Sequence, residues 1–388
     1  MNISEILFSL LSNEMAGMPL HEEIKETIND ELLLKLYKLS KSHDLAHLVG
    51  DALDKNDLFP AESKVRKSFI QERNMAVYRY EQINYELQEI CRALEENKIK
   101  HIPLKGSVIR KYYPAPWMRT SCDIDILIHK EDLDNAIAVL SAELKYKHEY
   151  GCFHDESLYS EGGVHLELHH TLLEDAYNPN AAQILESVWA DATPKSGYNY
   201  LLELSNEMFY FYHIVHMAKH FINGGCGIKP FLDIIVIENN MCLNPVKCNE
   251  LLNKGNLLKF SDNAKKLAHV WFKGAERDEM ANCLEEYVLH GGVYGTLKNK
   301  VVAQQAQRGG KFRYALTRIF QPYEQLKQAY PIITKHKWLM PFYQVVRWFR
   351  IIFKGNVKKS MQELSMNATV GDETRERTKE LLNELGLE

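Results

Sequence analysis

Hydrophobic residues recur at three- and four-residue steps through the first quarter of the chain. The clearest case is the stretch 65–97, which contains neither Pro nor Gly. Such spacing places apolar side chains on one stripe of a long amphipathic helix. We therefore predict that residues 1–97 form a helical region. The stripe comprises Val65, Phe69, Ala76, Tyr80, Ile83, Leu87, Ile90 and Leu94.

The period changes after residue 97. A short extended run ends at Gly106, the sequence DIDILIH reads as a strand, and a helix follows over 130–146. The next segment predicts two strands joined through Gly162 and Gly163. Beyond Asp175 the helical pattern returns, so a small α/β domain is expected between helical regions. We predict four parts: an N-terminal helical region (1–97), an α/β core (98–178), a helical domain (179–295) and a basic aromatic helical segment with an acidic tail (296–388).

The composition narrows the class of protein. The chain has 388 residues, 45% hydrophobic and 26% charged, as ordinary globular proteins do. No apolar run reaches the roughly 18 residues that a membrane span needs. The N-terminus lacks the basic region of a signal peptide. The seven cysteines are scattered without a CxxC pair, which predicts neither a zinc ribbon nor a disulfide framework. The reducing cytoplasm is the expected compartment.

Charge is distributed unevenly along the chain. The whole chain carries −5, yet residues 298–359 contain fourteen Lys or Arg and one acid. Aromatic residues are interleaved with these cations, as in RNA-binding surfaces or helices on anionic membranes. The interpretation we favour is that Trp338, Phe342, Trp348 and Phe353 pack a helix onto the protein body. The basic groups then form a solvated face.

Two carboxylates, Asp123 and Asp125, lie one residue apart inside an apolar run. Burying an unpaired carboxylate is costly, so such acids usually have a partner or a metal. Alternate residues of a strand share a face, so these two side chains project together, about 5–7 Å apart. The same alternation puts Glu167 on one face with His165 and His169. Three carboxylates on adjacent strands suit magnesium, which prefers oxygen ligands.

The tripeptide Lys105-Gly106-Ser107 ends the first predicted strand. Glycine permits a tight turn, and Ser107 with the following amides, at a helix start, can hold a phosphate. Lys105 and Arg119 are further candidates for neutralising phosphate charge.

A strand ending in Gly-Ser, an Asp-x-Asp strand and a third acidic strand together resemble the DNA polymerase beta-type nucleotidyltransferase superfamily. More closely, "IPLKGSVIRKYYPAPWMRTSCDIDILI", then "HLELHH" and later "HMAKHF", looks like an uncharacterised bacterial family of nucleotidyltransferase-like proteins within it. The resemblance implies an α+β fold with a small mixed sheet, flanked by N- and C-terminal helical regions. It also implies transfer of a nucleoside monophosphate from an NTP to a hydroxyl, with two Mg²⁺ ions or with Mn²⁺.

Matched to that pattern, Asp123 and Asp125 would hold both metal ions. Glu167 would complete one metal site and draw the proton from the acceptor hydroxyl. Gly106 and Ser107 match the glycine-serine element, and Lys105 stands where many members have a small residue. NTP is the expected partner, with a small molecule or protein favoured over RNA as acceptor.

Several assignments remain alternatives at this level. His216, Lys219 and His220 share one predicted helix and would line the nucleotide cleft with Lys229 and Asp233, or form a buried polar face. For His165 and His169, a supporting role beside Glu167 is favoured over a transition-metal site. Correspondingly, a catalytically inactive nucleotide- or partner-binding protein and a metal-dependent hydrolase are the alternatives to a nucleotidyltransferase.

Overall fold

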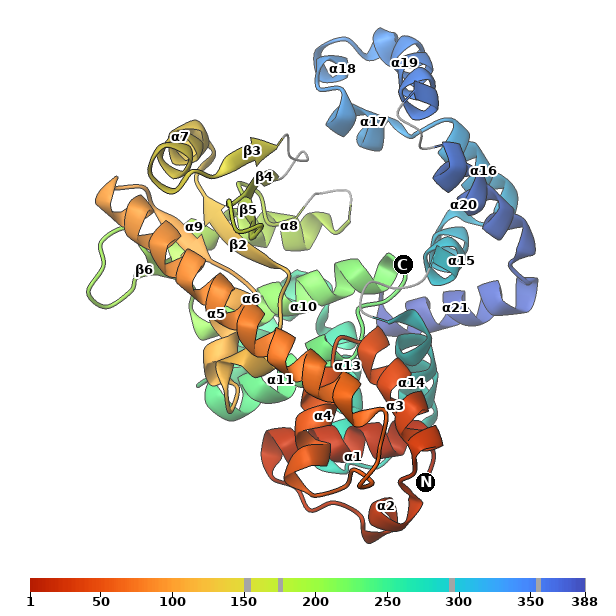
Figure 1. Ribbon diagram of the computed structural model, residues 1–388. Coiled ribbons are helices and arrows are strands. Elements are labelled where there is room, and N and C mark those ends of the chain that lie inside the picture. The colour runs from red at the N-terminus through yellow and green to blue at the C-terminus, as the bar shows by residue number, and fades with distance from the viewer. Residues whose placement is uncertain (150–154, 174–176, 293–296, 354–356, 388) are drawn as a thin grey trace.

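The computed structural model describes residues 1–149, 155–173, 177–292, 297–353 and 357–387 (Figure 1). A five-stranded sheet lies between helical regions, with strand order β1-β2-β5-β4-β3. The pairing of β2 with β5 is parallel and the other three pairings are antiparallel, so the sheet is mixed. The strands are β1 (His101–Pro103), β2 (Asp123–Ile128), β3 (Lys147–Glu149), β4 (Asp155–Tyr159) and β5 (His165–His169).

One face of the sheet packs on two helices. The alternating residues Ile124, Ile126 and Ile128 of β2 are fully buried there. They share a hydrophobic core with the long helix α5 (Arg66–Glu96) and with α7 (Leu133–Leu144). Between β1 and β2 the chain forms α6 (Gly106–Ile109), η1 (Arg110–Tyr112) and η2 (Pro116–Met118), and η3 (Lys130–Asp132) precedes α7. Because one face is apolar, the alternate residues of β2 and β5 turn to the opposite face.

The helices before and after the sheet share a larger hydrophobic core. Phe8 of α1 stacks on Trp271 of α13, with ring centroids 4.4 Å apart. The helices before α5 are α1 (Ile3–Ala16), α2 (Glu22–Thr27), α3 (Asp30–Ser42) and α4 (Ala46–Lys55). Those after the sheet are α8 (Pro179–Glu186), α9 (Val188–Asp191), α10 (Asn206–Ile222), α11 (Lys229–Asn240), α12 (Pro245–Lys254), α13 (Leu258–Lys273) and α14 (Glu279–Gly291), with the hairpin β6 (Thr193–Pro194) and β7 (Leu202–Glu203).

Of the remaining helices, α15 and α21 contribute residues to the core of the body, and α17, α18 and α19 lie farthest from it (Figure 1). Here the interpretation of the aromatic residues as core is wrong: Trp338 is 76% exposed, Phe342 60% and Phe353 81%. Only Trp348 of the four is half-buried, against Phe320. This part comprises α15 (Leu297–Arg308), α16 (Lys311–Ile319), α17 (Tyr323–Ala329), α18 (Ile332–Lys335), η4 (Lys337–Leu339), α19 (Met340–Phe353), α20 (Val357–Thr369) and α21 (Asp372–Leu385).

The predicted fold class, α+β with a small mixed sheet between helical regions, is confirmed. The stripe at 65–97 is α5, and β4 and β5 are the two predicted strands joined through Gly162 and Gly163. The short strand β3 was not predicted, because its three residues are all exposed and show no alternation. Within the described ranges, none of the helices combines the length and apolar character that a membrane crossing requires. The four-part division remains a prediction.

Candidate active site

The three predicted carboxylates meet on the polar face of the sheet. In the parallel pairing of β2 with β5, Asp123 lies beside His165 and Asp125 beside Glu167. The side chains of these four residues alternate with buried Ile and Leu residues, so they project to the same face. We call Asp123, Asp125 and Glu167 the acid cluster. The register therefore builds the cluster from two segments about forty residues apart in sequence.

The acid cluster and its histidines have metal-ligand spacing. Possible ligand atoms of Asp123, His165 and Glu167 lie within 4.8 Å of one another, and so do those of Asp125, Glu167 and His169. Three carboxylates offer the oxygen donors that Mg²⁺ or Mn²⁺ prefers, so the donor set fits such an ion. Glu167 belongs to both groups.

Asp125 is the most enclosed of the three acids, 4% exposed, and it already has two partners. Lys105 Nζ donates to its Oδ1 over 2.6 Å, and His169 Nε2 lies 2.8 Å from the same atom. Burial alone would raise the pKa of Asp125, but Lys105 and His169 outweigh burial and hold that pKa below its usual value. His169 Nε2 also lies 3.4 Å from Glu167 Oε2. His169 thus links two of the three carboxylates, the supporting role predicted for it.

Asp123 and Glu167 respond differently to this setting. Burial, and then the neighbouring Asp125 carboxylate, raises the pKa of Asp123 to about 6. The hydrogen bond with His169 lowers the pKa of Glu167, although burial opposes it. Asp123 therefore ionises last in the absence of a ligand, and a bound cation would favour its ionised form.

The Lys105-Gly106-Ser107 turn is tight. Lys105 adopts φ 46° and ψ −121°, a left-handed region that non-glycine residues rarely occupy. A Cβ at Gly106 would meet Ser121 Cβ at 3.3 Å, so this position leaves little room for a side chain. The amide of Ser107 donates to Leu104 O over 3.1 Å. The Ser107 hydroxyl is buried without a hydrogen-bond partner among the described residues.

Two of the three predicted residues of α10, His216 and His220, lie near Lys105. His216 and His220 have ring centroids 4.4 Å apart, and burial, followed by the charge of Lys105, lowers the pKa of both. The pKa of His220 falls to about 4, so this ring is neutral at pH 7. Tyr212 lies one turn before His216 and is buried. Burial is the main cause that raises the pKa of the Tyr212 phenol, and the nearby carboxylates of the acid cluster raise it further. Lys219 points elsewhere: its Nζ lies 5.0 Å from the centre of the Tyr177 ring.

Tyr212 was missed in the sequence. It could have been found by extending the four-residue step from His220 through His216 back along the same helix face.

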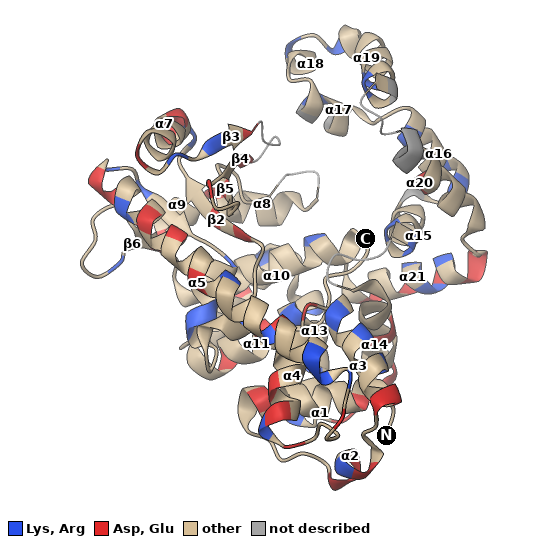
Figure 2. Cartoon of the chain, viewed as in Figure 1, with Lys and Arg blue, Asp and Glu red and all other residues tan. Residues whose placement is uncertain are grey.

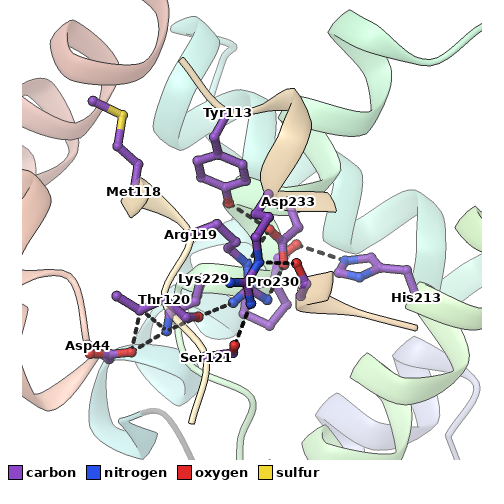
Figure 3. Close-up of polar contacts among 12 residues, drawn as sticks. Asp44, Tyr113, Met118, Arg119, Thr120, Ser121, His213, Lys229, Pro230 and Asp233 are labelled. Atoms are coloured by element: carbon purple, nitrogen blue, oxygen red, sulfur yellow. Dashed lines mark hydrogen bonds and ion pairs between the residues drawn. The ribbon is translucent and has the colours of Figure 1, made fainter. Parts of the chain in front are cut away.

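Arg119 lies in a second cluster of charges, built around Asp233 (Figure 3). Its guanidinium donates to both oxygens of Asp233, each over 2.7 Å, and Tyr113 Oη donates to Asp233 Oδ1 over 2.6 Å. Lys229 pairs with Asp44 and also donates to Thr120 Oγ1 over 2.8 Å. We call these six residues the paired network. The guanidinium predicted to neutralise phosphate is thus engaged by Asp233.

The paired network holds the loop that leads into β2. Thr120 Oγ1 donates to Asp44 over 2.7 Å, and Arg110 Nη2 donates to Ser121 Oγ over 2.6 Å. Ser121 Oγ in turn donates to the backbone oxygen of Asp123 over 3.1 Å. Residues from α3–α4, from η1 and from α11 therefore fix the position at which the Asp-x-Asp strand begins.

A cavity of about 690 Å³ lies beside β1 and is separate from the acid cluster. Its lining includes Ser107, Lys111, Tyr112 and Lys195, together with residues of α5, but none of the three carboxylates. Ser107 therefore faces a different space from the acids with which it was predicted to act.

Residues 31–273 match the model of a family described as uncharacterised nucleotidyltransferase. The search of curated proteins gave no match. Among solved structures, the chain is similar to an antigenic nucleotidyltransferase-like protein from Paracoccidioides brasiliensis. That match has 15% identity and a TM-score of 0.32, and it covers 52% of this chain and 95% of the other.

Proposed function

We propose that this chain, which belongs to the uncharacterised nucleotidyltransferase family, transfers a nucleoside monophosphate from an NTP to a hydroxyl group with the help of a divalent cation. The observation that carries the proposal is the acid cluster, three carboxylates of two parallel strands on one face of the sheet. A carboxylate surplus of this kind is costly without a cation, and its oxygen donors fit Mg²⁺ or Mn²⁺.

Each residue of the site has a role in this proposal. Asp123, Asp125 and Glu167 would hold the cation, which when bound neutralises triphosphate charge and stabilises an in-line displacement at phosphorus. The acceptor oxygen bonds to the α-phosphorus, the bond to pyrophosphate breaks, and the hydroxyl proton passes to Glu167, whose lowered pKa keeps it ionised at neutral pH. Lys105, released from Asp125, would contact a phosphate.

The other predicted contacts have smaller parts. His216 and His220, held neutral by burial, would offer ring nitrogens rather than charge to the nucleotide. We favour a small molecule or a protein side chain as the acceptor over an RNA end.

The test is transfer of label. The purified protein is incubated with each α-³²P-labelled NTP, Mg²⁺ and a cell extract, and the labelled product is identified. Wild type should label an acceptor, and Asp125→Asn should label it at least roughly 100-fold less, because a metal-binding charge is lost at nearly constant size. Asp134→Asn, an exposed acid on α7, is the matched control and should act as wild type. Equal labelling by wild type and Asp125→Asn would refute the proposal.

A second candidate, nucleotide binding without transfer, is favoured by the ion pair of Lys105 with Asp125. In that case calorimetry would detect NTP binding of similar strength in Mg²⁺ and in EDTA, and no NTP would yield a labelled product. A metal-dependent hydrolase, the third candidate, rests on His165 and His169 beside Glu167. It predicts a requirement for zinc or iron, which imidazole ligands favour.

A further inference from the structure

The distal helices expose an unusual amount of apolar surface. On α19, Phe342, Val345, Phe349 and Phe353 are 60%, 42%, 55% and 81% exposed. Their spacing of three and four residues places them along one stripe of the helix. We call residues 311–353, from α16 through α19, the basic arm. Its other exposed large apolar side chains are Phe312, Leu316, Ile319, Phe320, Ile332 and Trp338.

The inner side of α19 is held by polar contacts in addition to ring contacts of Trp348 with Phe320 and of Tyr343 with Tyr330. Gln344 is 5% exposed and exchanges hydrogen bonds with the backbone of Gln321, over 2.6 and 3.2 Å. Arg347 and Trp348 donate to the backbone oxygen of Ile319 over 2.7 and 2.8 Å. A helix of a soluble protein normally turns its apolar stripe inward. Here polar groups anchor α19 to the end of α16, and the apolar stripe faces outward.

The basic arm is also strongly cationic. Residues 311–353 contain eight Lys or Arg and one acid, Glu324. Figure 2 shows blue segments and no red ones on α18 and α19, whereas red segments are frequent on α5 and α21. Arg313, Lys335, Lys337 and Arg350 are exposed, and no described carboxylate pairs with any of these four.

We propose that the basic arm binds the surface of a membrane that contains anionic lipid. The outward Phe, Trp, Val, Leu and Ile side chains would enter the boundary between headgroups and acyl chains, and the exposed cations would meet lipid phosphates and carboxylates. The binding is peripheral, since no described helix is long and apolar enough to cross a membrane.

Two other occupants fit the surface less well. RNA would stack on aromatic rings, but Leu316, Ile319, Ile332 and Val345 have no ring on which a base could stack. A second copy of this chain would bring two arms of the same positive charge together in a symmetric contact, which repulsion opposes. An anionic lipid surface matches both the aliphatic side chains and the charge.

The experiment is co-sedimentation of the full chain with vesicles at 150 mM salt. Vesicles of phosphatidylcholine with phosphatidylserine should retain the protein, at least about 10-fold better than vesicles of phosphatidylcholine alone. Equal retention by both, or by neither, would overturn the proposal.

Paired variants test the two components of binding. Phe349→Ser with Phe353→Ser should reduce retention at least about 10-fold, and so should Lys337→Gln with Arg350→Gln. The matched controls Tyr85→Ser and Lys67→Gln alter exposed side chains of α5 and should retain wild-type binding. Circular dichroism should show unchanged helix content in all four, because the altered side chains are exposed.

Three results would assign the basic arm to another role. They are arm variants that bind vesicles as wild type does, light scattering that shows a dimer abolished by the Phe variants, and retention on RNA at 150 mM salt that exceeds retention on vesicles. Each of these would overturn the membrane proposal and leave the proposed transfer reaction untouched.

Discussion

The acid cluster and the paired network differ in the balance of their positive and negative side chains. In the paired network, Arg119 faces Asp233 and Lys229 faces Asp44, one cation for each carboxylate. In the acid cluster, three carboxylates share a single lysine, Lys105, and a titratable His169. Buried pairs of matched charge hold segments together, whereas an excess of one sign persists where a ligand of the other sign completes it.

The two clusters are connected through one loop. The paired network fixes Arg119 and Thr120, and the next residue, Ser121, bonds to the backbone of Asp123. A structural cluster therefore sets the place at which a functional one begins. Substitutions that distinguish the two clusters should separate an effect on stability from an effect on ligand binding.

The largest expected effect is on stability. Asp233→Ala leaves the buried guanidinium of Arg119 without its partner, which should lower the free energy of unfolding by about 3–5 kcal/mol. Urea-induced unfolding followed by circular dichroism measures this change. Asp134→Ala, at an exposed site, should stay within about 0.5 kcal/mol of wild type. A loss below about 1 kcal/mol for Asp233→Ala would show that the pairing does not hold the loop.

A smaller effect concerns pH at the border of the paired network. Burial lowers the pKa of His47 to about 4, whereas in the unfolded chain it lies near 6.5. Below pH 6.5 the unfolded state takes up a proton that the folded state does not, so stability falls as the pH falls from 6.5 toward 4. The loss at pH 5 relative to pH 8 should be about 2 kcal/mol for His47 alone.

Unfolding of wild type and His47→Gln at the two pH values measures that contribution. Burial lowers the pKa of His43 to about 4 as well, so the variant should retain part of the pH dependence. An unchanged pH dependence in His47→Gln would contradict the prediction.

In the acid cluster, the matching prediction concerns cation binding. Lys105→Met removes the positive charge beside Asp125 and should raise the affinity for Mg²⁺ or Mn²⁺ about 10-fold in the absence of nucleotide, because the like-charge competitor is gone. Affinity for NTP in saturating Mg²⁺ should fall if the released lysine contacts phosphate. Titration calorimetry measures both, with Lys111→Met, an exposed lysine of η1, as the control. Weaker cation binding by Lys105→Met would reverse the interpretation of this pair.

The smallest expected effect is the change in stability caused by Asp123→Asn, which should differ most clearly from that of Asp233→Ala. Asp123→Asn removes a carboxylate whose pKa is raised, first by burial and then by Asp125. At pH 8 this change should leave stability unchanged or raise it by up to about 1 kcal/mol. A loss comparable to that of Asp233→Ala, in the same unfolding assay, would mean that the two clusters do not differ in kind.

Local periodicity accounts for what the sequence predicted correctly. The alternation in β2 identified both the strand and the shared face of Asp123 and Asp125, and the stripe at 65–97 identified α5. The side-chain pairings were not accessible in the same way, because Arg119 and Asp233 are 114 residues apart and neither lies in a pattern that names its partner.

The sequence also did not predict which way the apolar stripe of α19 faces. The aromatic residues of α19 recur at helical spacing whether their stripe faces a core or faces solvent, so periodicity alone could not distinguish the two. The buried Gln344 and the inward Arg347 decide the orientation, and both are polar residues that would ordinarily be placed outside.

The parallel register of β2 and β5 has a consequence for how the site tolerates change over generations. The segment between the two strands contains α7, β3 and β4, which pack on or pair within the sheet, whereas the loops that join them can change in length without altering that register. A single residue lost inside β5 is a different matter, because side chains alternate with a period of two. Such a deletion would turn Glu167 toward α5 and bring Leu166 or Leu168 beside Asp125. We therefore expect insertions in the loops between β2 and β5 among descendants of this chain, but no single-residue insertions or deletions within β5.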